Sequence, residues 1–88
     1  MTEKEKMLNG LPYNASDVEL VQDRLRAKKL CKIFNNLDPD NLEERVNVLK
    51  ELFKTNSNPY IEPNFFCDYG YNIELGKNFY ANHNCIIL

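Results

Sequence analysis

Features that would point to a membrane protein, a secreted protein or a polyanion-binding protein are missing from this sequence. No apolar run approaches the roughly 18–20 residues that span a bilayer, and the N-terminal stretch MTEKEKMLNG is charged where a secretory signal needs apolar residues. The 11 basic and 13 acidic residues leave a net charge of −2, which gives no general attraction to nucleic acid or to an anionic membrane. We therefore expect a cytoplasmic protein without a nucleic-acid or membrane partner.

Cysteine and histidine are also scarce. The three cysteines, Cys31, Cys67 and Cys85, are odd in number and lie at unrelated spacings. This argues against a disulfide framework and predicts reduced thiols. His83 is the only histidine. A lone histidine on a strand is more often a surface or subunit-contact residue than a catalytic base, and we expect the same of His83.

Residues 1–54 predict three helices, at 3–8, 17–34 and 41–54, each of which starts with a capping-box pattern. The pairs are Thr2 with Glu5, Ser16 with Glu19, and Asp40 with Glu43. Apolar residues at spacings of three and four give the second and third helices one buried face each. These stripes are Val18, Val21, Leu25, Ala27, Leu30, Cys31 and Phe34, and then Leu42, Val46, Leu49, Leu52 and Phe53. The turn-forming residues 35–40 between them predict an antiparallel helical hairpin.

From residue 61 onward the sequence follows a period of six. One register is apolar and predicts side chains that point inward, while the other holds residue types that tolerate the positive φ of a corner. Such a repeat is typical of a β-helix, in which short parallel strands wind into stacked coils. The apolar register is Ile61, Cys67, Ile73, Phe79 and Cys85, and the corner register is Asn64, Gly70, Gly76 and Asn82.

The helical part and the repeat part meet at the break formed by residues 55–59. We expect an α+β protein with a helical segment over 1–57 and the start of a hexapeptide-repeat β-helix over 58–88. Stacked coils need a neighbour on each side, so the apolar run from Cys85 to Leu88 would leave an uncovered edge. The chain is therefore expected to be the front part of a larger architecture. No metal site is expected, because Cys67 and Cys85 occupy the inward apolar register.

Two stretches of the sequence carry a resemblance to a known family. The first has the spacing Met7-x2-Gly10-x2-Tyr13-x3-Asp17-x2-Leu20-x3-Arg24-x2-Ala27-x2-Leu30. The second reads Cys67-Asp68-Tyr69-Gly70-Tyr71-Asn72-Ile73. Together they resemble the N-terminal helical segment and the opening of the hexapeptide domain of the maltose and galactoside O-acetyltransferases. Asp68 favours the maltose branch, because the galactoside branch has a serine there.

This resemblance implies a left-handed parallel β-helix with three hexapeptides per coil, assembled as a homotrimer. Cys67 and Cys85, 18 residues apart, would then stack in successive coils. The family transfers an acetyl group from acetyl-coenzyme A to a hydroxyl of a maltose- or glucose-type sugar, in a cleft between neighbouring subunits. Its catalytic histidine and its coenzyme A site belong to later coils. This chain alone is therefore expected to be inactive and to hold no catalytic, cofactor-binding or metal-binding residue.

The same resemblance assigns binding of the sugar acceptor to Asp17, Asp68 and Asn82. A carboxylate accepts hydrogen bonds from vicinal hydroxyls, and an amide both donates and accepts them, as a sugar requires. Each residue also has an ordinary explanation. Asp17 in the first turn of a helix suits the helix dipole, and Asp68 and Asn82 are common residue types at corners. The match to the family favours the binding role.

A second class of function stays open. The edge after Leu88 could pair with a strand of another chain, which would make this chain a non-catalytic interaction or capping module. A hexapeptide carbonic anhydrase is disfavoured, because it needs histidines on successive coils. The basic residues of the second helix are expected to form a solvated face, since no aromatic residues interleave with them. They are Arg24, Arg26, Lys28, Lys29 and Lys32.

Overall fold

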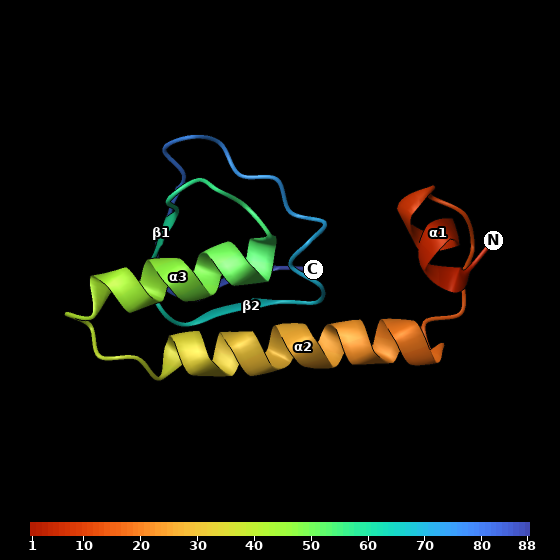
Figure 1. The fold of residues 1–88 in the computed structure, drawn as a ribbon, viewed down its shortest axis with the longest axis horizontal. Coiled ribbons are helices and arrows are strands. Elements are labelled where there is room, and N and C mark those ends of the chain that lie inside the picture. The colour runs from red at the N-terminus through yellow and green to blue at the C-terminus, as the bar shows by residue number, and fades with distance from the viewer.

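The computed structural model describes residues 1–88, with helices first and strands second, as predicted. The elements are α1 (Glu3–Leu8), α2 (Val18–Asn35), α3 (Leu42–Phe53), β1 (Tyr60–Ile61), β2 (Phe65–Cys67), β3 (Tyr80–Ala81) and β4 (Cys85–Ile87). The two longer helices run antiparallel side by side, and α1 lies beyond the N-terminal end of α2 (Figure 1). The predicted helical hairpin is therefore confirmed. None of the helices has both the length and the apolar character needed to span a membrane.

The predicted capping boxes hold at α1 but not at α2. The Oγ1 of Thr2 accepts from the backbone N–H of Glu5 at 3.0 Å, and the Glu5 side chain accepts from the backbone N–H of Thr2 at 3.4 Å. At α2 the cap is Asp17, whose Oδ2 accepts from the backbone N–H of Glu19 at 3.2 Å. Ser16 lies one residue before the cap, where its own N–H donates to the side chain of Asn14 at 3.0 Å.

The predicted capping box at α3 is also wrong. The N-cap residue is Asn41 rather than Asp40, and its side chain makes no capping hydrogen bond. A backbone turn explains the shift, because the N–H of Asn41 donates to the carbonyl of Asp38 at 3.0 Å. This turn draws Asp40 into the connection between the helices and leaves the helix to begin at Leu42.

One apolar core joins the helical hairpin to the strands. Its 12 buried residues come from α2, α3 and the first three strands, and Phe53 meets Phe65 edge to face at 5.6 Å between ring centroids. The buried residues are Ala27, Leu30, Cys31, Phe34, Val48, Leu49, Leu52, Phe53, Ile61, Phe65, Cys67 and Ala81. The burial of this apolar area against the strands is what fixes the hairpin on them.

The predicted apolar stripes are only partly buried. In α2 the C-terminal members are buried, but Val18, Val21 and Leu25 are exposed, Val18 by 75%. The reason is that α3 has 12 residues against 18 in α2 and covers only the C-terminal part of that helix (Figure 1). Leu20, which the stripe does not include, is fully buried. In α3, Leu42 is exposed, and Arg45 and Val48 are buried instead.

The strands pair in parallel, and their register differs from the predicted one. β1 pairs with β3 through Tyr60 and Tyr80, and β2 pairs with β4 through Phe65 and Cys85, so that partners are 20 residues apart in both pairs. Three hexapeptides would separate partners by 18. The predicted stacking of Cys67 on Cys85 is therefore wrong, because the segment between β2 and β3 is two residues longer than the repeat requires and Cys67 lies opposite Ile87.

Of the two predicted registers of the repeat, the inward one is confirmed and the corner one is confirmed only at Gly70. The inward register holds, since Ile61 and Cys67 are buried and its later members pack against the core as partly buried side chains. In the corner register only Gly70 has a positive φ, of 81°. A Cβ at Gly70 would collide with the backbone oxygen of Leu52, so the corner after β2 depends on glycine. Asn84, outside the register, has a φ of 60°.

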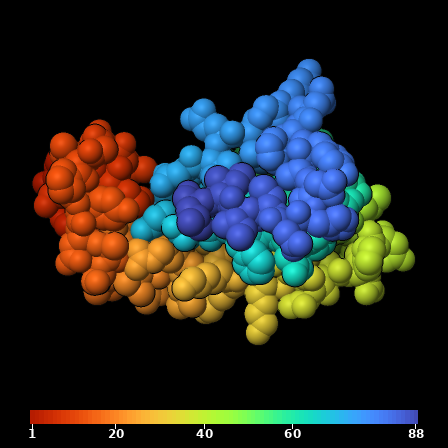
Figure 2. Space-filling view, turned by 180° about the vertical axis from the view of Figure 1, so that it is seen from behind, coloured from red at the N-terminus to blue at the C-terminus, as the bar shows by residue number.

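The C-terminal end of α2 is also attached to β2 by one side chain. The Oδ1 of Asn35 accepts from the N–H of Phe65 at 2.8 Å, and its Nδ2 donates to the carbonyl of the same residue at 3.1 Å. This two-point contact satisfies strand groups that would otherwise lack a partner. On the reverse face of the molecule, β4 in dark blue lies across the surface above α2 in orange and yellow (Figure 2).

Candidate functional site

Asp17 stands at the N-terminal end of α2, with its carboxylate half-buried. One carboxylate oxygen caps the helix through the N–H of Glu19. The segment that leads into this cap is held from the other side, because Arg24 donates from Nη2 to the carbonyl of Ala15 at 2.7 Å. A negatively charged side chain is thus fixed at a helix N-terminus, where the exposed N–H groups and the helix dipole also favour it.

Asp68 directly follows β2 and is half-buried. Its neighbour Tyr69 is buried, and the Tyr69 hydroxyl accepts a hydrogen bond from Nη1 of Arg24 at 2.8 Å. The same guanidinium therefore holds both the segment before Asp17 and the residue after Asp68. Arg24 is half-buried and bonded at both ends, so its predicted place on a solvated face is wrong. Its position in the matched helical spacing is the signal from which a specific role could have been predicted.

A second set of polar contacts fixes α1 to this end of the molecule. The Tyr71 hydroxyl donates to Oδ2 of Asp23 at 2.7 Å, and Nζ of Lys4 lies 3.3 Å from the same oxygen and 4.4 Å from the Tyr71 ring. Burial and the neighbouring carboxylate raise the pKa of Tyr71 above its usual value. Burial alone would raise the pKa of Asp23, but the Tyr71 and Lys4 contacts outweigh it and hold that pKa below its usual value.

Asn82 directly follows β3, is exposed and accepts from the N–H of His83 through Oδ1 at 2.8 Å. The N–H of Glu62 donates to the carbonyl of Ala81 at 2.9 Å, so Asn82 lies beside the residues that precede β2. Asp68 lies at the other end of that strand. No hydrogen bond joins Asn82 to Asp17 or Asp68, and none joins Asp17 to Asp68. The structure therefore does not gather the three predicted residues into one bonded cluster.

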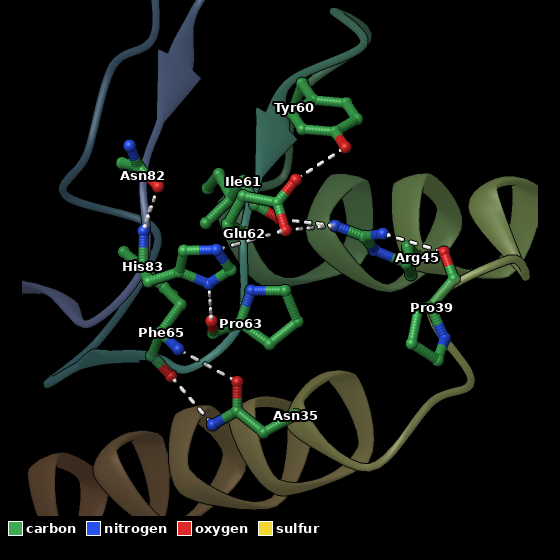
Figure 3. Close-up of polar contacts among 10 residues, drawn as sticks. All are labelled: Asn35, Pro39, Arg45, Tyr60, Ile61, Glu62, Pro63, Phe65, Asn82 and His83. Carbon is green, nitrogen blue, oxygen red and sulfur yellow. Dashed lines mark hydrogen bonds and ion pairs between the residues drawn. The ribbon is translucent and has the colours of Figure 1, made fainter.

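Near Asn82, the side chains of Tyr60, Arg45 and His83 surround the carboxylate of Glu62 (Figure 3). The hydroxyl of Tyr60 donates to Oε1 at 2.6 Å, and Oε2 lies 3.9 Å from Nη2 of Arg45 and from Nε2 of His83. The other ring nitrogen of His83 is 2.8 Å from the carbonyl of Pro63. His83 is exposed over 65% of its side chain, as expected of a surface histidine.

Arg45 is a buried charged side chain beside this group that the sequence did not single out. It is 5% exposed and donates from Nη2 to the carbonyl of Ile61 at 2.8 Å and from Nη1 to the carbonyl of Pro39 at 3.1 Å. Its guanidinium carbon also lies 5.3 Å from the centre of the Tyr60 ring. Because this buried guanidinium donates hydrogen bonds to two backbone carbonyls, it fixes the position of β1 and of the Glu62 carboxylate that follows β1. The helical period of α3 was the only available signal, since Arg45 shares a face with Leu49 and Leu52.

Comparison with known proteins places this arrangement in a family. Residues 6–55 match the family described as the maltose acetyltransferase hexapeptide capping motif. The chain belongs to that family. A protein of Dictyostelium discoideum that is named as an acetyltransferase is 48% identical over 89 residues, which cover the whole of this chain and 46% of the relative.

Solved structures support the assignment of this chain to the same family. A maltose O-acetyltransferase from Clostridium difficile superposes with a TM-score of 0.95 at 49% identity, over all of this chain and 48% of that one. A galactoside acetyltransferase in complex with coenzyme A superposes with a TM-score of 0.88 at 37% identity, over all of this chain and 44% of that one. The predicted resemblance is confirmed. The chain spans about half the length of the relatives that it matches.

Proposed function

We propose that the complete protein is a sugar O-acetyltransferase, which moves the acetyl group of acetyl-coenzyme A to a hydroxyl of a maltose- or glucose-type sugar. The observation that carries this proposal is the superposition of the whole chain on a maltose O-acetyltransferase with a TM-score of 0.95. Coenzyme A in the structure of a related galactoside acetyltransferase supports acetyl-coenzyme A as the donor.

The role proposed for this chain is to supply the helical cap and the first coils of a left-handed parallel β-helix. Both strand pairs are parallel, and partners are 20 residues apart in each pair, as is expected of strands in successive coils of one β-helix. In this arrangement the helical segment over residues 1–57 covers one side of the coil formed by residues 58–88.

Asp17 and Asp68 are proposed to bind the sugar acceptor. Their segments are held by one guanidinium, that of Arg24, which fixes the two backbones relative to each other. Each carboxylate can accept hydrogen bonds from sugar hydroxyls, and such charge-assisted bonds are stronger than those between neutral groups. Holding the acceptor in place before reaction removes an entropic cost of up to several kcal/mol from the barrier.

Asn82 is proposed to serve a different cleft from Asp17 and Asp68. It follows β3 and lies beside the start of β2, whereas Asp68 lies past the end of β2. In a homotrimer with clefts between neighbouring copies, opposite ends of one side of the coil would face different clefts. Each cleft would then take Asp17 and Asp68 from one copy and Asn82 from the next.

His83 is placed outside the catalytic machinery in this proposal. A general base needs a ring nitrogen that is free to accept the proton of the attacking hydroxyl. In His83, Nδ1 lies 2.8 Å from the carbonyl oxygen of Pro63, and Nε2 lies 3.9 Å from Oε2 of Glu62. We propose that the group that removes the proton comes from another part of the complete protein, as the family resemblance implies.

The proposal is tested by acetylation assays on the product of the complete gene, with maltose, glucose and a galactoside as acceptors. We expect Asp17→Asn and Asp68→Asn each to lower kcat/KM for maltose by about 10- to 100-fold, the value of one or two hydrogen bonds to a charged group. The amide introduced by Asp17→Asn can still accept from the N–H of Glu19, so the helix cap is kept. Asp38→Asn, in the exposed turn between α2 and α3, is the matched control and should leave kcat/KM unchanged.

Two results would contradict the proposal. One is a complete protein that transfers acetyl groups to none of these sugars. The other is normal kcat/KM in both aspartate variants, which would remove Asp17 and Asp68 from the acceptor site while leaving the activity in place. His83→Gln should keep kcat within about twofold of the parent enzyme, since no bond to the reacting atoms is lost.

A further inference from the structure

A cavity on the α2 side of β2 leads to two of the three cysteines. It has a volume of about 480 Å³ and is lined by residues from the C-terminal half of α2 and from β2 and the turn before it. Cys31 and Cys67 lie in its wall, each almost fully buried. Other lining residues, such as Lys28 and Phe66, are exposed, and Phe66 is exposed by 48%. The cavity therefore reaches from the surface to the two thiols.

The two thiols lie in the wall of the same cavity. Cys31, on α2, and Cys67, at the end of β2, are both unpaired and both belong to the buried core where the helix meets the strand. The neighbouring Cys67 lowers the pKa of Cys31 to about 7. Cys31 in turn raises the pKa of Cys67, and burial and the nearby carboxylate of Asp68 add to that rise. Two neighbouring thiols of unequal pKa suit the roles of an attacking and a resolving cysteine.

We propose that Cys31 and Cys67 form a reactive dithiol that a small anionic disulfide oxidises to an internal disulfide linking α2 to β2. The charge of the cavity selects the anionic reagent. Lys28 and Lys32 lie in its wall, and no acidic residue does. The amides of three asparagines, Asn35, Asn36 and Asn64, add hydrogen-bonding groups for carboxylates.

The reaction has two steps and balances without a further reagent. The Cys31 thiolate attacks one sulfur of the disulfide R–S–S–R, so that a mixed disulfide forms and RS⁻ leaves. Cys67 then gives its proton to the released RS⁻ and attacks the sulfur of Cys31, which expels the second RS⁻. The protein loses two electrons and the small disulfide gains them, giving one internal disulfide and two small thiols. Capping of Cys31 removes the main cause that keeps Cys67 protonated.

Cys85 provides an internal control. It lies on β4 opposite Phe65, does not line the cavity and is paired with neither of the other cysteines. Cys85→Ala should therefore leave the reaction unchanged. Cys67→Ala should stop at the mixed disulfide on Cys31, because the resolving thiol is missing.

The test treats the purified product of the complete gene with oxidised glutathione at pH 7 and follows its mass after acid quenching, with peptide mapping of the product. We expect the parent chain and Cys85→Ala to lose two hydrogen atoms and to yield the peptide that joins Cys31 to Cys67. Cys31→Ser should react about tenfold more slowly, since its remaining thiols have less thiolate at this pH. Lys28→Gln with Lys32→Gln should slow the reaction with oxidised glutathione but not with the neutral disulfide of 2-mercaptoethanol.

Three outcomes would overturn the proposal. They are a parent chain that stays reduced, a parent chain that ends as a stable mixed disulfide, and a disulfide that maps to Cys85. The peptide map of the parent protein tests the proposal even if a cysteine variant fails to fold. Acetyl transfer is not part of this readout, so failure here leaves the proposed function untouched, and failure of the proposed function leaves this result untouched.

Discussion

The two halves of α2 carry similar apolar patterns but are held in different ways. The C-terminal half lies under α3 and β2 and buries Phe34 completely. The N-terminal half extends past α3 and exposes Val18 and Val21. It buries one apolar side chain, that of Leu20, and is otherwise attached through Arg24 and Asp23. An apolar residue is buried only where another element covers it, so a stretch of helix that α3 does not cover can present polar groups at fixed positions. That stretch begins with Asp17, one of the proposed acceptor residues.

The largest difference between the halves should appear when one apolar side chain is truncated in each. Phe34→Ala is expected to lower the free energy of unfolding by about 3–5 kcal/mol, since it opens a cavity in the shared core. Val18→Ala, at an exposed position, should change it by less than about 0.5 kcal/mol. Urea unfolding followed by circular dichroism measures both. Equal losses would mean that the two halves are held alike.

The polar attachment of the N-terminal half should show a smaller, pairwise effect. Arg24→Met combined with Tyr69→Phe in a double-mutant cycle should give a coupling free energy of about 1 kcal/mol, the usual net value of one hydrogen bond. Lys29→Met, exposed on the same helix, serves as the control and should show no coupling to Tyr69→Phe. A coupling near zero for Arg24 would show that its bond to Tyr69 does not hold this end of α2.

The smallest effect should be a dependence of stability on acid. The pKa of Asp23 in the folded protein lies below the usual value of 3.8. The ionised carboxylate therefore stabilises the fold at pH values above 3.8, and this stabilisation is lost as the pH falls through the folded-state pKa. Asp23→Asn should remove this loss. The carboxylate is partly exposed, so we expect less than about 1 kcal/mol. Melting curves between pH 6 and about pH 2.5 measure it, and an unchanged acid dependence in the variant would contradict the contact with Tyr71.

Local signals predicted the helices well but could not decide contacts between distant residues. Thr2 and Glu5 cap α1 as their spacing indicates, whereas Asp17 displaces Ser16 because both residues can cap and the turn made by Asn14 decides between them. The helical period does not reveal how far a partner helix extends, so the exposure of Val18 could not be read from the sequence. An apolar period likewise cannot show that Arg45 is buried by its two carbonyl partners.

The strands show the same limit. A period of six predicts which side chains point inward, and Ile61 and Cys67 do. The stacking of Cys67 on Cys85 required every coil to have the same length, and the longer segment between β2 and β3 breaks that condition. Cys67 instead shares the wall of one cavity with Cys31 of α2, an arrangement that no spacing in the sequence indicates.

The acceptor role of the uncovered end of α2 is tested most directly by a crystal structure of the complete protein with maltose bound. We predict that sugar hydroxyls donate hydrogen bonds to the carboxylates of Asp17 and Asp68 of one copy, with Arg24 still bonded to Tyr69. Well-defined maltose at another place, with both carboxylates free of the sugar, would contradict the account.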